Sequence, residues 1–167
     1  LMIDADILIT GDLNKIFNLS IDNKLYAVGE PGSRKWHYFL WVKSKVRWLP
    51  KIAFSCGVFL FNNCNEIKGL FCKVHQHIKT HIREGKKMPS SMDQPFVIYH
   101  CINHNNYNNT LLNDYIQMAQ NINEEEFINK YDKYNKKVIL HHVGTGTGGP
   151  DIKIKLLSAY LKKINNN

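Results

Sequence analysis

Long apolar runs are missing from this chain, and their absence excludes the first class of protein. No stretch approaches the roughly 20 consecutive apolar residues that a membrane-spanning helix needs. The 10 glycines and 5 prolines follow no collagen-like pattern, and we find no internal repeat and no domain linker. The 4 cysteines include no C-x-x-C pair and no Cys/His spacing typical of a structural zinc site. Membrane-spanning, collagenous and disulfide-scaffold proteins are therefore excluded.

Acidic residues are in the minority. Asp and Glu number 14 against 22 Lys and Arg, which gives a net charge of +8 and a sequence pI near 9.3. This excess suits an anionic partner, such as nucleic acid, a membrane surface or a phosphorylated substrate. The 44% of apolar and 22% of charged residues are ordinary for a globular protein, and 167 residues fit one domain.

The two ends of the sequence differ in character. The first residue is Leu1 rather than Met, and residues 1–9 (LMIDADILI) are typical of a strand core from the start. We therefore expect the chain to be the later part of a larger fold. The cysteines lie in or beside apolar segments, which favours a reducing, cytoplasmic setting. Residues 165–167 are all Asn and predict a disordered tail.

Strand and helix patterns alternate along the chain, which predicts the α/β class. Strands are expected at 1–9, 24–28, 53–61 and 137–142, where apolar residues run together. Helices are expected at 67–82, ending at Gly85, at 93–102, capped by Ser90 or Ser91, and at 152–164, with Ile154, Leu157 and Leu161 facing inward.

The tripeptide Asp4-Ala5-Asp6 is the first candidate for chemistry. In a strand, residues two apart share a face, so the two carboxylates would repel each other unless they were protonated or bound a cation. A Mg²⁺ or Mn²⁺ ion that also binds substrate phosphates resolves this conflict. The alternative is that the strand ends near Asp4 and the acids lie in a solvated turn. The aliphatic residues on both sides favour the metal site.

A histidine followed by a glycine-rich turn is the second candidate. His141 and His142 end an apolar strand, and Gly144–Gly149 follows directly before a helix. Imidazole binds Mn²⁺, and backbone N–H groups of such a turn hold phosphate oxygens. The turn is neither a Walker A loop nor a dinucleotide-binding fingerprint. A flexible hinge with a surface histidine is the alternative.

Three other groups are more ambiguous. Asp93 and Gln94 open a helix, where an acid usually just complements the helix dipole. His75, His77 and His81 share a helix but lack the Glu of an H-E-x-x-H site, so we interpret them as solvated. Residues 33–50 are basic and aromatic, with Trp36, Trp41 and Trp48, and would suit stacking on nucleic-acid bases or on sugar rings.

Together these stretches resemble family 8 of the retaining glycosyltransferases, which includes glycogenin and bacterial lipopolysaccharide galactosyltransferases. Residues 1–30 look like that family's passage through its D-x-D metal motif. Phe54–Val58 (FSCGV) resembles its Phe-Asn-Ser-Gly-Val, Asp93-Gln94 its Asp-Gln pair, and His141 with Gly144 its late His-x-x-Gly. The four motifs occur in the family's order across nearly the whole chain.

The resemblance implies a GT-A type fold, with a mixed central sheet flanked by helices, whose N-terminal nucleotide-binding portion is missing from residues 1–167. It implies a hexosyltransferase that moves a sugar from a UDP-sugar to a glycan, protein or lipid-linked hydroxyl acceptor with retention of configuration. Mn²⁺ (or Mg²⁺) is the implied cofactor. The implied metal ligands are Asp4, Asp6 and His141. Asp93 and Gln94 would face the transferred sugar, and Gly144, Gly146 and Lys153 would contact the diphosphate.

Two departures from the family pattern bear on this expectation. The family's Lys-Pro-Trp after the late glycine is replaced by Thr147-Gly148-Gly149, so Lys153 or Lys155 would have to supply the phosphate contact. Ser55 replaces the family's Asn and is shorter by an amide group, so we expect an altered contact with a sugar hydroxyl there. A nucleic-acid-binding module that uses residues 33–50 is the alternative function, although nucleic acid is the less favoured partner, and a non-catalytic relative is a further one.

Overall fold

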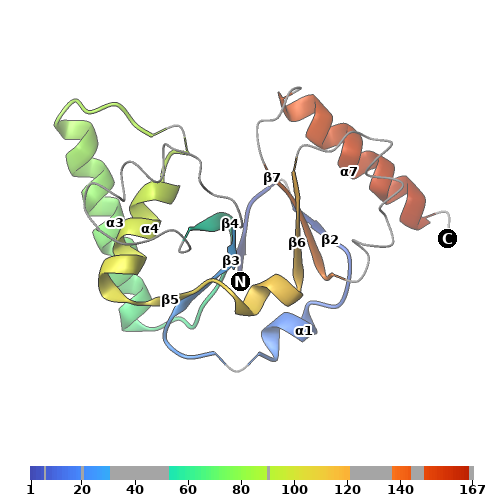
Figure 1. Cartoon of the computed structure of the whole chain (residues 1–167), viewed down its shortest axis with the longest axis horizontal. Coiled ribbons are helices and arrows are strands. Elements are labelled where there is room, and N and C mark those ends of the chain that lie inside the picture. The colour runs from blue at the N-terminus through green and yellow to red at the C-terminus, as the bar shows by residue number, and fades with distance from the viewer. Residues whose placement is uncertain are drawn as a thin grey trace. The chain divides into compact units, whose positions relative to one another are not determined.

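The computed structural model describes residues 1–5, 7–19, 21–30, 53–89, 91–120, 137–143 and 149–165 (Figure 1). The chain forms two compact units, each assembled from separate stretches of sequence. The first contains Leu1–Met2 and Ser20–Asn113, and the second contains Ile3–Leu19 and Asp114–Asn167. Strands and helices occur in both units, which confirms the predicted α/β class.

A four-stranded sheet with the strand order β1-β4-β3-β5 is the frame of the first unit. Its strands are β1 (Met2–Ile3), β3 (Leu25–Gly29), β4 (Phe54–Leu60) and β5 (Tyr107–Asn108). β3 pairs antiparallel with β4 and parallel with β5, and its register with β4 shifts between Ala27 and Val28. The strands expected at 24–28 and 53–61 are thereby confirmed.

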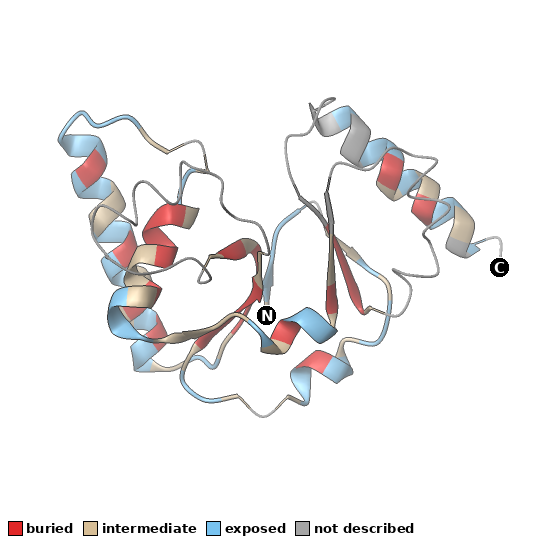
Figure 2. Ribbon diagram, viewed as in Figure 1, coloured by how far each residue is buried: buried red, intermediate tan, exposed pale blue. Residues whose placement is uncertain are grey.

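Two helices, α3 (Asn65–Arg83) and α4 (Gln94–His104), pack together, and α4 also contacts β4 (Figure 1). α3 has one buried and one exposed face, as Figure 2 shows, whereas α4 is buried or half-buried over residues 94–102 and exposed only at Asn103 and His104. Their buried residues join those of β3 and β4 in one apolar core: Leu25, Ala27, Phe54, Phe59, Ile67, Leu70, Val74, Phe96, Val97, Ile98 and Cys101. Each fully buried large side chain contributes about 1.5–3 kcal/mol.

The two helix ends show how local sequence sets the boundaries. Gly85 follows the end of α3 with φ +67°, and its N–H donates to the carbonyl oxygen of Ile82, as a glycine C-cap requires. α4 begins later than expected, because Asp93 rather than a serine stands at the N-cap position. The carbonyl oxygen of Asp93 accepts the N–H groups of Phe96 and Val97. Pro95 lacks an N–H and is tolerated in this first turn.

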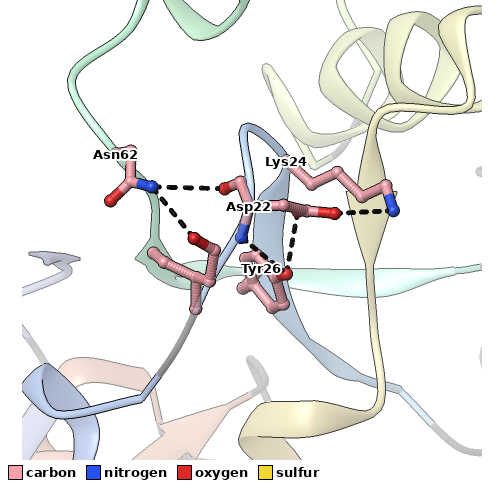
Figure 3. Close-up of polar contacts among 5 residues, drawn as sticks. Asp22, Lys24, Tyr26 and Asn62 are labelled. Atoms are coloured by element: carbon pink, nitrogen blue, oxygen red, sulfur yellow. Dashed lines mark hydrogen bonds and ion pairs between the residues drawn. The ribbon is translucent and has the colours of Figure 1, made fainter.

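A polar network fixes the turn before β3 (Figure 3). The hydroxyl of Tyr26 donates to the Asp22 carboxylate at 2.9 Å, and Lys24 forms an ion pair with the same carboxylate at 2.9 Å. The amide of Asn62 donates to the carbonyl oxygen of Ile21 at 3.1 Å, which connects the turn to the end of β4. The Lys24 and Tyr26 hydrogen bonds hold the pKa of Asp22 below its usual value.

The histidines of α3 correct one prediction. His75 is exposed, as expected, but His81 is buried, and the rings of His77 and His81 both pack edge-to-face against Phe96 of α4. His81 also contacts the carbonyl oxygen of Lys87 at 3.0 Å. The interpretation of all three as solvated was wrong for two of them, because α3 presents that face to α4.

A three-stranded sheet with the order β2-β7-β6 is the frame of the second unit. Its strands are β2 (Ile7–Ile9), β6 (Ile116–Gln120) and β7 (Ile139–Val143). The central strand β7 runs antiparallel to β2 and parallel to β6. Both faces of β7 are buried, since Ile139 and Leu140 are each fully covered. This confirms the strand expected at 137–142.

The first strand differs from its prediction as a single buried element over residues 1–9. Residues Met2 and Ile3 are about two-fifths exposed, the chain leaves the strand at Asp4, and Ala5 lies in a turn before β2. A carboxylate inside a fully paired strand would lose its hydration, which favours an interruption at that residue. After β2, the Asp12 carboxylate accepts the N–H of Asn14 at the start of α1 (Asn14–Phe17).

The last helix, α7 (Gly149–Asn165), is confirmed, but two of the three residues predicted to face inward do not do so. Ile154 and Leu161 are 62% and 41% exposed, and Leu157 is half-buried. Among the described side chains of α7, Leu156 and Tyr160 are buried. Asn165 belongs to the helix, and residues 166 and 167 lie outside the described part. None of the described helices has the length and apolar character that crossing a membrane requires.

Candidate active site

The pairing of β2 with β7 places the predicted metal-binding histidine beside the strand that follows the D-x-D tripeptide. Ile7, the first residue of β2, stands opposite His141 in the antiparallel register. On its other side, His141 stands opposite Met118 of β6. The imidazole is therefore held in the middle of the sheet and is only 3% exposed. Two segments separated by more than 130 residues in sequence meet at this point.

The two carboxylates of the tripeptide are described to different extents. Asp4 is exposed and precedes the turn at Ala5, which matches the alternative that the strand is interrupted there. Asp6 lies outside the described residues. Among the side chains that the structure describes, no three His, Cys, Asp or Glu form a group that could hold a metal ion. The donor types nevertheless suit a hard or borderline divalent cation, since carboxylate oxygen and imidazole nitrogen both bind Mn²⁺.

The second predicted group, Asp93 and Gln94, lies in the first unit at the start of α4. Asp93 is exposed and makes no side-chain cap. Gln94 is half-buried, and its amide nitrogen donates to the carbonyl oxygen of Phe54 at 2.7 Å. Phe54 is the first residue of β4 and is fully buried. The contact therefore fixes the first turn of α4 against the N-terminal end of β4.

Glu30 is a neighbour of this pair that sequence reasoning missed. The Gln94 amide nitrogen also reaches a Glu30 carboxylate oxygen, at 3.4 Å. Glu30 directly follows β3, and its backbone N–H donates to the carbonyl oxygen of Ala53 at 3.2 Å. In the sequence it belongs to a Gly-Glu-Pro-Gly turn signal, which indicates a chain reversal but not a partner 64 residues away. The sequence signal that could have identified Glu30 is its position as an acid directly after a buried strand.

Ser55 shows where the chain departs from the family motif. Its side chain is buried, and its hydroxyl oxygen accepts the N–H of Gly57 at 3.2 Å. This hydroxyl is therefore engaged within β4 itself.

Several predicted residues cannot be placed. Gly144 and Gly146 lie outside the described residues, as does the basic and aromatic stretch 33–50 with its three tryptophans. Lys153 belongs to α7, but its side chain is not among those described. Asp4 and His141 belong to the second unit, and Asp93 and Gln94 to the first.

Comparison with known proteins agrees with these motifs. The profile of glycosyl transferase family 8 matches residues 1–146. No curated protein matches the sequence. Among solved structures, the chain is similar to the apo structure of WbbM, described as a bifunctional glycosyltransferase, with a TM-score of 0.55 and 14% sequence identity. The match covers 94% of this chain and 34% of that one, so the chain spans about a third of its length.

The structural likeness confirms the fold, and the profile match decides the family. The mixed sheets with flanking helices are those of the predicted GT-A type fold. The profile covers all four motifs, from the D-x-D tripeptide to the late histidine and Gly144. On this match over most of its length, the chain is a member of glycosyl transferase family 8.

Proposed function

We propose that this chain takes part in metal-dependent transfer of a hexose from a UDP-sugar to a hydroxyl acceptor, with retention of configuration. The observation that carries the proposal is the register of β2 with β7. It places His141 beside Ile7, the residue that follows Asp6 in the sequence. Family membership supports glycosyl transfer as the reaction class.

Asp4, Asp6 and His141 are the proposed ligands of Mn²⁺ or Mg²⁺. Two carboxylates and an imidazole leave further coordination positions for the oxygens of a diphosphate. When bound, such an ion would supply Lewis-acid stabilisation of the negative charge that grows on the departing UDP. Burial of His141 in the central strand limits its motion, so that this ligand is oriented before the donor binds.

Gly144, Gly146 and Lys153 are the proposed contacts to the diphosphate. Backbone N–H groups of a glycine-rich turn before a helix suit an anion, and α7 begins directly after this turn. The positive net charge of the chain favours the same ligand. Lys153 takes the part of the lysine that the family motif has after its late glycine.

Asp93 and Gln94 are the proposed residues nearest the transferred sugar. The contacts of Gln94 with Phe54 and Glu30 hold its amide group in one orientation. In the proposed reaction, an acceptor oxygen bonds to the anomeric carbon from the side that the diphosphate leaves. The bond between that carbon and the diphosphate oxygen breaks, and the acceptor proton passes to the leaving diphosphate.

The test is donor hydrolysis and transfer by the full-length protein, with UDP-glucose and UDP-galactose, in the presence and absence of Mn²⁺. Asp4→Asn and Asp6→Asn should each reduce turnover by at least a hundredfold, and EDTA should abolish it until Mn²⁺ is restored. Asp12→Asn is the matched control. It removes a nearby carboxylate but keeps an oxygen that can cap α1. Turnover that is indifferent to EDTA and to both substitutions would overturn the metal assignment.

A further inference from the structure

A histidine pair crosses the contact between α3 and α4. Nδ1 of His77 lies 3.2 Å from Nε2 of His100, which is hydrogen-bonding distance. One of these nitrogens must donate and the other accept, so the bond cannot form when both rings are fully protonated. Both rings are half-buried, so water cannot fully replace the bond.

Basic and aromatic groups lie against this pair. Lys73 on α3 lies with its ammonium nitrogen 3.3 Å from Nε2 of His104, and the His104 ring stacks on His100 with a centroid separation of 6.2 Å. Phe96 and Tyr99 meet His77 edge-to-face at 5.1 and 5.4 Å. β4 also packs against α4 and contains no Lys, Arg, His, Asp or Glu.

These surroundings disfavour a positive charge on His100. Burial is the largest cause, and together with the charges of His77, His104 and Lys73 it lowers the pKa of His100 from 6.5 to about 4. Between pH 4 and pH 6.5, His100 therefore binds a proton in the unfolded chain but not in the folded chain. Folding stability from this group is therefore fully present above pH 6.5 and is lost as the pH falls toward 4.

Helix α4 connects the His77–His100 pair to the candidate active site. α4 begins at Gln94 and contains His100 less than two turns later. A helix moves as a unit, so loosening its contact with α3 also loosens the position of Gln94 against β4. We propose that the His77–His100 contact is an acid-sensitive lock between α3 and α4, which holds the Asp93–Gln94 pair in place at neutral pH and releases it on acidification.

The first test measures the lock directly and does not depend on the proposed activity. NMR titration of the histidine ring signals of the full chain should show His100 titrating near pH 4. Titration of His100 near 6.5, like a solvated histidine, would overturn the proposal. In parallel, the urea midpoint of the wild-type chain should fall steadily between pH 7 and pH 4.5.

Substitutions assign this pH dependence to the pair. His100→Gln replaces the ring with a neutral side chain and should flatten the decline of the urea midpoint. His75→Gln, on the exposed face of α3, should leave the decline as in the wild type. If His100→Gln does not fold, Lys73→Gln serves instead. It removes an exposed cation, so the pKa of His100 should rise toward 6.5 and the decline should shrink. Equal slopes in the substituted and wild-type chains would overturn the proposal.

The effect on the active site rests on the proposed function and is tested separately. If the chain hydrolyses a UDP-sugar, the acid side of its pH–rate profile should move to lower pH in His100→Gln and stay in place in His75→Gln. If the urea midpoint of His100→Gln loses its pH dependence but its pH–rate profile does not move, the connection to Gln94 would be overturned. Absence of hydrolysis at every pH would count against the proposed function, and the NMR and unfolding results would still decide the lock.

Discussion

The side-chain amide nitrogen of Gln94 lies 2.7 Å from the carbonyl oxygen of Phe54, and this contact joins the first residue of α4 to the first residue of β4. The same nitrogen approaches the Glu30 carboxylate. Gln94, which we propose to lie near the transferred sugar, thus also holds three segments of the first unit together. Substitutions at Gln94 are therefore expected to change stability as well as activity.

Gln94→Ala is expected to lower the free energy of unfolding by about 1 kcal/mol, because a buried carbonyl loses its donor. Gln94→Glu should cost more at pH 7, since its carboxylate would face both the Phe54 carbonyl oxygen and the Glu30 carboxylate. Urea unfolding of the two variants measures which of them has the lower free energy of unfolding. Gln76→Ala, on an exposed position of α3, is the control and should change stability by less than about 0.5 kcal/mol. A Gln94→Glu chain as stable as the wild type would contradict this account.

His141 and His142 are adjacent, and only His141 is proposed to bind metal. His141→Ala should abolish Mn²⁺ binding measured by calorimetry and should also lower stability, because the ring fills a buried position in β7. His142→Ala should leave Mn²⁺ binding within about threefold, a difference of under about 1 kcal/mol. The reverse pattern would reassign the ligand to His142.

Two glycines offer opposite outcomes for the same substitution. At Gly29, a Cβ atom would lie 2.5 Å from the backbone oxygen of Asn109, so Gly29→Ala should cost about 1–3 kcal/mol. At Gly69, inside α3, a Cβ atom would meet nothing within 4 Å, so Gly69→Ala should stabilise by about 0.5–1 kcal/mol. Thermal unfolding of both variants gives the comparison. A Gly29→Ala chain with unchanged stability would show that the β3 end is adjustable.

Met92 adopts the left-handed conformation with φ 50°, directly before the Asp93–Gln94 pair. Its side chain is 64% exposed, so backbone strain rather than packing should dominate the effect of substitution. Met92→Gly is expected to raise the free energy of unfolding by about 1 kcal/mol, and Met92→Ile to lower it by a similar amount, because β-branched residues tolerate this region least. The stability order Gly, Met, Ile is the measurable outcome, and any other order would contradict it.

The features that the sequence predicted best are those set by residues close together in the chain. The apolar rhythm of α3, its glycine cap at Gly85 and the apolar run of β4 all agree with the structure, because each arises within a few residues. The D-x-D tripeptide and the late histidine were recognised by residue type and order. The position of His141 opposite Ile7, the residue after the tripeptide, follows from strand pairing that no local pattern contains.

What the sequence could not predict depends on contacts between distant segments. Periodicity shows which residues of a helix share a face, but not which face meets another element, and this is why His77 and His81 were misinterpreted. On α7 the expected face and the face with Leu156 and Tyr160 are both apolar, and packing selects the second. The contact of Glu30 with Gln94 likewise joins residues 64 positions apart.

The order of strands in the second unit has a consequence for biosynthesis. β2 is made early, but its partner β7 emerges from the ribosome only after the whole 20–113 segment of the first unit. That segment can begin to fold while β2 still exposes unpaired backbone N–H and C=O groups to solvent. Closing the β2–β7 pair requires a long loop, which slows folding and prolongs exposure of an aggregation-prone edge. During translation, chaperone protection of β2 should therefore favour correct folding of the second unit.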